Sequence, residues 1–190
     1  MQAQTFTLDD ADPATAGHAA SIKFFHWATV IAIVAAAAAV LLRELIDDKT
    51  LRLILIETHR SFGVAVLMLT AGRLVARRVS GHASAAQDLG PLPRIGAALT
   101  HLALYGLMAG LPLLGWALTN ANGKAVRLLG LIELPRIVAA DLDLADSLAD
   151  WHLRAAWALL IMVLAHAGAA LWHHFFRRDA VLVAMLPRRR

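Results

Sequence analysis

The sequence predicts an all-α integral membrane protein in which four helices form a bundle. Of its 190 residues, 59% are hydrophobic, and the mean hydropathy is +0.61. Soluble domains are nearer ~45–50% apolar. The apolar residues also gather in four blocks, each close to the ~20 residues that a helix needs to cross a hydrocarbon core ~30 Å thick. The lipid bilayer is therefore the first expected partner.

The four predicted spans follow from these blocks and from the polar residues that bound them. They run from about Phe24 to Leu42, Leu53 to Ala76, Ile95 to Leu118, and Ser147 to Phe176. The last start is set by Ser147 with an acid three residues later, a pattern typical of a capping box. We expect one domain over residues 21–187, a mobile tail over residues 1–20 and a basic tail over residues 188–190.

The connections between the later spans contain residues that favour turns. The loop from Arg77 to Arg94 contains two glycines and two prolines, Gly81, Gly90, Pro91 and Pro93. Such residues favour turns because of their backbone geometry. The longer connection from Thr119 to Asp146 contains Asn122-Gly123 and Pro135, and we expect it to be irregular.

The distribution of charge predicts that both termini face the cytoplasm. With that orientation the inner segments have ten bases against five acids, and the outer segments have eight bases against nine acids. Cytoplasmic loops of membrane proteins are enriched in Lys and Arg. The excess of bases behind the net charge of +4 is therefore attributed to cytoplasmic loops of a multi-pass membrane protein. Because the basic residues form no patch interleaved with aromatic residues, nucleic acid is not an expected partner.

Four histidines lie where a bundle could bring them together in pairs. His152 and His166 are fourteen residues apart on the fourth span. This places them ~21 Å apart along a helix and on nearly the same face. In the predicted topology His59 lies at the outer level with His152, and His26 lies at the inner level with His166.

Two level-matched histidine pairs predict two haems, one near each leaflet. Paired histidines from facing helices are how a helical bundle holds a haem iron. The chain has no cysteine, so any haem must be non-covalent. A zinc site is a weaker alternative because zinc takes three or four convergent ligands. Four haem ligands are therefore expected, at His26, His59, His152 and His166.

Smaller features around these positions allow two interpretations each. Gly63, one turn below His59, and the small residues around His166 would leave room for a flat macrocycle, or would only let helices approach. His173 and His174 lie near the inner face, where they are either interfacial residues or donors to the headgroup of a quinone. His101, near the same face, is either a hydrogen-bonding partner or a contact to an inner cofactor such as that quinone.

The chain resembles the bacterial cytochrome b561 family of small di-haem membrane proteins. The resemblance covers about residues 21–187. It rests on motifs that span the chain: Phe25-His26-Trp27, Glu57 to Gly63, Arg73, Leu111-Pro112, Gly115-Trp116, Asn122-Gly123-Lys124, Gly130 to Pro135, Trp151-His152, His166, His173-His174-Phe175, Arg178-Asp179 and Met185-Leu186-Pro187. Many members carry a Lys where this chain has Trp172, so a role of that Lys toward a quinone or haem propionate does not carry over.

The resemblance implies a four-helix bundle with two b haems on the same four histidines, located in the bacterial inner (cytoplasmic) membrane. The family includes a superoxide oxidase that passes electrons to ubiquinone. We therefore expect transmembrane electron transfer from superoxide, or another periplasmic one-electron donor, to ubiquinone. Bases near the outer haem would attract an anionic donor: Arg43, Lys49, Arg52, Arg60, Lys124, Arg127 and Arg154.

Two other functions remain open at the level of sequence. The chain could be the haem-bearing membrane anchor of a partner dehydrogenase or hydrogenase, passing electrons between that partner and the quinone pool. It could also be a transporter without redox chemistry, whose histidines relay protons. An optical spectrum separates the transporter from both haem proteins, and co-purification separates the anchor from an enzyme that acts alone.

Overall fold

The computed structural model describes residues 20–79, 90–179 and 181–186. Four long helices dominate it: α1 (Ala20–Glu44), α2 (Lys49–Val79), α3 (Pro91–Ala121) and α4 (Leu142–Trp172). All four are long and apolar enough to cross a membrane. The predicted all-α membrane bundle is therefore confirmed. Most of the predicted tail at residues 1–20, part of the loop from Arg77 to Arg94 and the basic tail at 188–190 lie outside the described residues.

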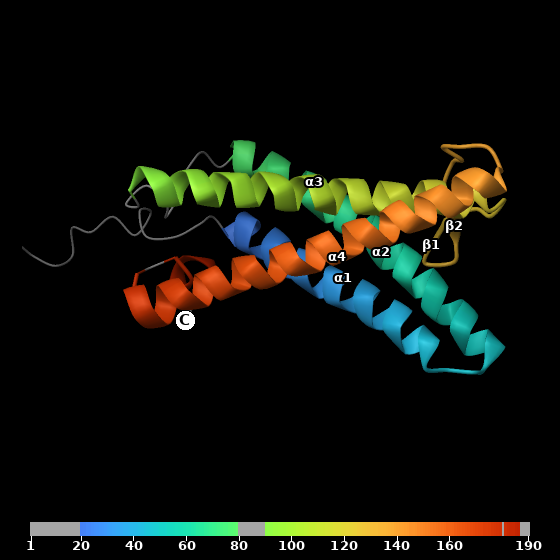
Figure 1. The fold of residues 1–190 in the computed structure, drawn as a ribbon, viewed down its shortest axis with the longest axis horizontal. Helices are drawn as coiled ribbons and strands as arrows, with labels where there is room; N and C mark the ends of the chain where they lie inside the picture. The colour runs from blue at the N-terminus through green and yellow to red at the C-terminus, as the bar shows by residue number, and fades with distance from the viewer. Residues whose placement is uncertain (1–19, 80–89, 180, 187–190) are drawn as a thin grey trace, which may run out of the picture.

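The helices are arranged as two antiparallel pairs, α1 with α2 and α3 with α4, and α2 also packs on α3 (Figure 1). The turn between α1 and α2 and the connection between α3 and α4 lie at one end of the molecule. The start of α1 and the end of α4 lie at the other end (Figure 1). We call these the hairpin side and the C-terminal side.

The helices extend further than the apolar blocks that predicted them. Asp48 precedes α2, and its carboxylate accepts a hydrogen bond from the Leu51 N–H, as an N-cap does. Pro91 and Pro93, predicted in a loop, lie in the first turn of α3, where proline loses no intrahelical hydrogen bond. Polar residues and prolines thus lengthen α2 and α3 beyond the part that their hydropathy marks.

The predicted start of the fourth helix at Ser147 is wrong. The helix begins five residues earlier, where Asp141 is the N-cap and accepts a hydrogen bond from the Leu144 N–H at 3.0 Å. Asp143 in the first turn favours this start because an acid complements the helix dipole. Ser147 lies inside the helix, where its hydroxyl donates to the Asp143 carbonyl.

The connection between α3 and α4 is more ordered than the sequence predicted. It contains a short antiparallel hairpin of β1 (Arg127–Leu128) and β2 (Ile132–Glu133). The fully buried side chain of Asn120 holds the connection, donating to the Lys124 carbonyl and accepting from the Ile137 N–H. A hydroxyl on α2 then holds the hairpin, because Ser61 Oγ accepts from the Leu129 N–H at 3.0 Å.

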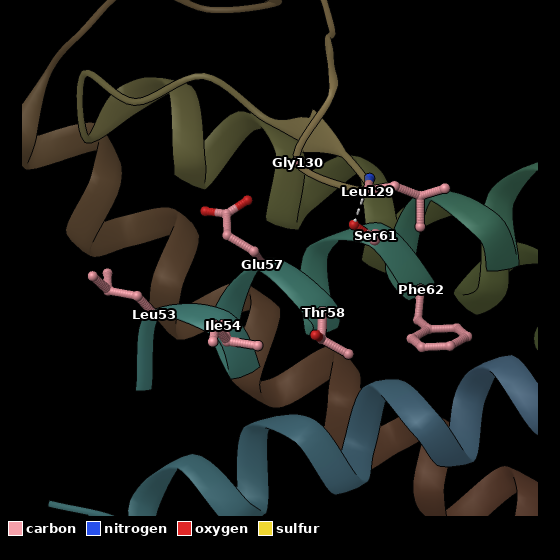
Figure 2. Close-up of a pocket in the computed structure, with 8 residues that line it drawn as sticks. All are labelled: Leu53, Ile54, Glu57, Thr58, Ser61, Phe62, Leu129 and Gly130. Carbon is pink, nitrogen blue, oxygen red and sulfur yellow. Dashed lines mark hydrogen bonds between the residues drawn. The ribbon is translucent and has the colours of Figure 1, made fainter. Parts of the chain in front are cut away.

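The hairpin and α2 together bound a mostly apolar groove of about 470 Å³ (Figure 2). Its lining consists of Leu53, Ile54, Glu57, Thr58, Ser61, Phe62, Leu129 and Gly130. Glu57 forms an ion pair with Arg60 through Oε1, and its Oε2 is buried without a hydrogen-bond partner.

A small apolar core draws one or two residues from each helix. Its buried members are Ala32, Val66, Leu104, Met108 and Leu159. Val66 lies seven residues after His59, and Leu159 lies midway between His152 and His166. This core therefore forms an apolar layer between the two ends of the bundle.

The end of α4 folds back on the start of α1. A π-helical turn, η2 (His173–Arg177), follows α4, and the left-handed Arg178 (φ 52°) ends it. The predicted end of the fourth span at Phe176 thus lies within one residue of the end of this turn, where the candidate membrane span also ends, although the regular α-helix stops at Trp172. A 3₁₀ turn, η3 (Val183–Met185), follows. Lys23 and Trp27 of α1 donate to the carbonyls of Leu186 and Met185, each at 3.0 Å.

Candidate functional site

The structure brings the four predicted histidines together in the two predicted pairs. The ring centroids of His59 and His152 lie 6.1 Å apart, with the ring planes at 76°. Those of His26 and His166 lie 6.5 Å apart, with the planes at 73°. In each pair one ring comes from α4 and the other from a helix that faces it. All four residues are neither fully buried nor exposed.

The hairpin-side pair is held in place by the backbones of the other two helices. His59 Nδ1 lies 2.9 Å from the Ala36 carbonyl on α1. Because a carbonyl only accepts, this contact requires the proton on Nδ1 and leaves Nε2 able to bind a metal. His152 packs against Gly115 on α3, where an added Cβ would meet His152 Cε1 at 3.0 Å.

His152 has one polar atom that the protein leaves unpartnered. Its Nδ1 is buried, and the Leu111 backbone lies nearby without meeting hydrogen-bond geometry. A buried imidazole that coordinates a metal through one nitrogen usually donates from the other. Closure of this contact by a small shift of the ring would complete such an arrangement.

The C-terminal-side pair belongs to a larger group of polar side chains. The ring of His101 on α3 lies 5.5 Å from that of His166, closer than His26 does. Arg73 on α2 lies near enough to His166 to interact electrostatically, and its guanidinium lies 5.7 Å from the centre of the Tyr105 ring. All four helices therefore contribute to this level.

The predicted quinone residues after α4 have partners of their own. His173 Nδ1 forms a 2.5 Å contact with Asp179, and the His174 ring packs edge-on against Phe175 at 5.0 Å. Partial burial raises the pKa of Asp179, but the hydrogen bonds from His173 and Val181 and the positive charges nearby outweigh it, so this pKa is lowered. The carboxylate is thereby kept ionised beside His173.

The spacing within each pair suits two ligands on opposite sides of one metal ion. A histidine nitrogen binds a metal at about 2 Å, and the ring centre lies about 1 Å further, so two such rings have centroids roughly 6 Å apart. Among the described residues no group of three or more His, Cys, Asp and Glu side chains could hold a metal ion. Among the described residues, no atom outside its own helix lies within 4 Å of a Cβ built on Gly63. These features fit a flat prosthetic group that needs only two axial ligands.

The fold and this arrangement define a class of helical bundle whose four helices can cross a membrane and which pairs histidines at two levels. A model of the family described as prokaryotic cytochrome b561 matches residues 17–188, which is most of the chain. The chain belongs to this family, as its resemblance predicted, and the family implies binding of haem b and transmembrane electron transfer.

Three curated relatives are similar over much of their length. Cytochrome b561 homolog 1 of Escherichia coli K12 is 31% identical over 170 residues, which is 88% of this chain and 95% of the relative. Homolog 2 of the same organism is 30% identical over 68% of this chain and 69% of the relative. A protein of Yersinia pestis named probable superoxide oxidase CybB is 32% identical over 70% of this chain and 74% of its own length.

Sequence reasoning missed several residues that shape the two levels. Tyr105 is the single tyrosine of the chain and follows His101 by one helical turn, which was the available signal. Gly115 appeared only as part of a family motif, because its contact with His152 joins two helices. Ser61 appeared only inside a family motif and Asn120 gave no signal, because their partners are backbone atoms of the connection between α3 and α4.

Proposed function

We propose that this protein transfers electrons across the bacterial inner membrane through two non-covalent b haems. His59 and His152 hold the outer haem, and His26 and His166 hold the inner one. The observation that carries the proposal is the close approach of the histidine rings in each pair, with centroids 6.1 Å and 6.5 Å apart. The α4 members of the two pairs, His152 and His166, lie seven residues before and seven residues after Leu159. The family and the apolar layer between the levels support it.

The haems supply one-electron chemistry when bound, and the protein sets their environment. The Ala36 carbonyl holds His59 with Nε2 free, and the small surface of Gly115 sets the position of His152. Gly63 leaves open space one turn below His59, where the outer macrocycle would pack.

The proposed donor is superoxide, or another periplasmic one-electron donor, at the outer level. Three of the expected bases are already paired with acids: Arg43 with Glu44, Arg60 with Glu57 and Arg127 with Glu133. Arg154 lies over the Trp151 ring, two residues beyond His152, and is paired with no carboxylate among the described residues. Together with the exposed Lys124, it is the base best placed to attract an anion. The name of the Yersinia pestis relative supports this donor.

The proposed acceptor is ubiquinone at the inner level. Two superoxide ions would give up two electrons and leave two molecules of oxygen, and one ubiquinone would take up those electrons with two protons. His173, held by Asp179 through Nδ1, can pass a proton from Nε2 to a quinone oxygen. His174 and His101 are the further candidate donors to the headgroup.

The number of haems tests the proposal directly. Pyridine haemochrome analysis of the purified protein should give close to two b haems per chain. His59→Ala and His152→Ala should remove one haem, and His26→Ala and His166→Ala the other. A value near one haem, or a common haem lost from His59→Ala and His166→Ala, would contradict the pairing. A colourless protein would instead favour a proton-relaying transporter.

The quinone residues need a separate experiment. Replacing both His173 and His174 with Ala should slow ubiquinone reduction while both haem bands stay unchanged. Arg177→Ala, in the same turn and exposed, is the matched control. Unchanged quinone turnover in the double variant would move the acceptor site to the outer level.

A further inference from the structure

Arg73 is a charged side chain inside the membrane-crossing part of α2 whose role the axial histidines do not explain. Its Nε is buried and has no hydrogen-bond partner. Arg77, one turn further on, adds a second positive charge nearby. Charged residues inside a membrane span are rare and mostly functional, because an unpaired charge is costly away from water.

The surroundings of Arg73 hold its guanidinium in place without neutralising it. The Tyr105 ring lies 5.7 Å from the guanidinium carbon and is an uncharged partner. The ring of Phe25 fills the space at Gly72, where an added Cβ would meet Phe25 Cε1 at 2.6 Å. This close approach of α1 and α2 fixes the backbone next to both Arg73 and His26. Among the described residues no carboxylate is paired with Arg73.

The position of Arg73 indicates what anion it would meet. It lies close enough to His166 to interact electrostatically, at the level of the His26–His166 pair. A haem carries two propionate carboxylates at its edge, and arginine binds carboxylates through a fork of parallel N–H donors. An anion bound at this level next to a haem would therefore complete the pairing that the protein leaves open.

We propose that Arg73 binds a propionate of the haem held by His26 and His166, with Tyr105 supporting the guanidinium. This inference rests on the proposed function, because it needs a haem at that level. It adds a charged contact to the two axial ligands. The residue then fixes the rotation of the haem about its axis and raises its reduction potential, since a nearby cation favours the more negative, reduced state.

The test compares Arg73→Gln with Arg78→Gln in the purified holoprotein. Arg78 is exposed on the same helix, so the control makes the same charge change away from the level. Redox titration should show a lower midpoint potential for the inner haem in Arg73→Gln. In Arg78→Gln this midpoint potential should be unchanged. With haem isotope-labelled in its propionate carboxyl carbons, the redox infrared difference spectrum should show a shifted carboxylate band only in Arg73→Gln.

A second variant keeps the experiment decisive where Arg73→Gln loses the inner haem altogether. Arg73→Lys retains the charge but not the fork, so it should keep the haem, with an intermediate potential and a shifted labelled band. An inner haem lost from Arg73→Gln and retained by Arg73→Lys supports the contact. An unshifted labelled band in both variants would overturn it, whatever happens to the potential.

An anionic lipid headgroup offers the same chemistry and is distinguished by the membrane used. The spectra should be the same in nanodiscs of zwitterionic lipid and in nanodiscs containing anionic lipid. An effect of Arg73→Gln that appears only with anionic lipid assigns the residue to lipid and overturns the inference. If His166→Ala, made in a chain that keeps Arg73, removes no haem, the proposed function itself is contradicted. An intact inner haem with an unshifted band contradicts only the role of Arg73.

Discussion

Single backbone contacts, more than single functional groups, decide how the histidines are presented. His59 is turned by the carbonyl of Ala36, and His152 rests on a residue without a side chain, Gly115. The sequence predicted which histidines meet, because their spacing and the order of the spans determine that. It could not predict these contacts, because each joins two helices. The rotation of one helix relative to another cannot be inferred from the local sequence pattern of either.

At this scale Gly115→Ala is expected to disturb the hairpin-side level. An added Cβ would lie 3.0 Å from His152 Cε1, so the ring must move by a few tenths of an ångström. Changes in groups that orient a metal ligand commonly weaken binding by about 10–100-fold. Haem retention during dilution, followed by the optical spectrum, should fall for one haem only. At Gly106 on the same helix an added Cβ meets no atom of another described element within 4 Å, so Gly106→Ala should behave as the wild type.

Arg154→Gln should reduce the rate at which superoxide reduces the protein. The arginine is unpaired with any described carboxylate and lies two residues from His152, so its removal weakens attraction of an anion. We expect a several-fold lower second-order rate constant at low salt and a weaker dependence on ionic strength. Pulse radiolysis measures both. Arg177→Gln makes the same charge change at the opposite end, and an equal loss there would contradict local steering.

At the scale of elements, the four helices were predictable from the sequence, but the start of α4 and the structure of the connection before it were not. Hydropathy located all four helices, because lipid-facing helices are apolar around most of their surface. The capping pattern at Ser147 predicted the start of α4 there, whereas the residue that caps the helix is Asp141. The β-hairpin went unpredicted since its strands have two residues each and depend on Ser61 of a distant helix.

The segment after α4 should loosen from α1 in acid. Asp179 has a lowered pKa in the folded protein, so its ionised carboxylate stabilises the docked segment. This stabilisation is fully present above the ordinary carboxyl pKa of ~3.9. That contribution is lost as the pH falls through the lower, folded value. A dye on Val183→Cys, in a chain with no other cysteine, should report constant docking from about pH 7 to 5 and release below about pH 4. In Asp179→Asn the segment should be loose at neutral pH and show no such transition.

At the scale of the whole molecule, the bundle has two different ends. One contains the β-hairpin and the groove in Figure 2, and the other contains the segment that folds back on α1 (Figure 1). The charge distribution predicts that the hairpin side faces the periplasm, while the geometry of the helices is equally compatible with either orientation. The orientation in the membrane is therefore predicted from the distribution of charged residues and not from the fold.

The absence of cysteine makes that orientation simple to measure. Gly130→Cys in the hairpin and Arg178→Cys after α4 place one thiol at each end, both at exposed positions. In intact bacterial spheroplasts an impermeant maleimide should label the first and leave the second unlabelled until the membrane is opened. The reverse result would invert the topology and, with it, the assignment of donor and acceptor to their sides.

The spacing of the histidines along α4 has a consequence for energy conservation. Fourteen residues separate His152 from His166 within one continuous helix, which is ~21 Å of a hydrocarbon core ~30 Å thick. An electron moving between the two proposed haems therefore crosses about two thirds of the membrane's electric field. A full crossing is worth ~2.3 kcal/mol per 100 mV, so this step costs or releases roughly 1.5 kcal/mol for each 100 mV. In an energised cell the membrane potential would therefore shift the equilibrium of the electron between the two proposed haems.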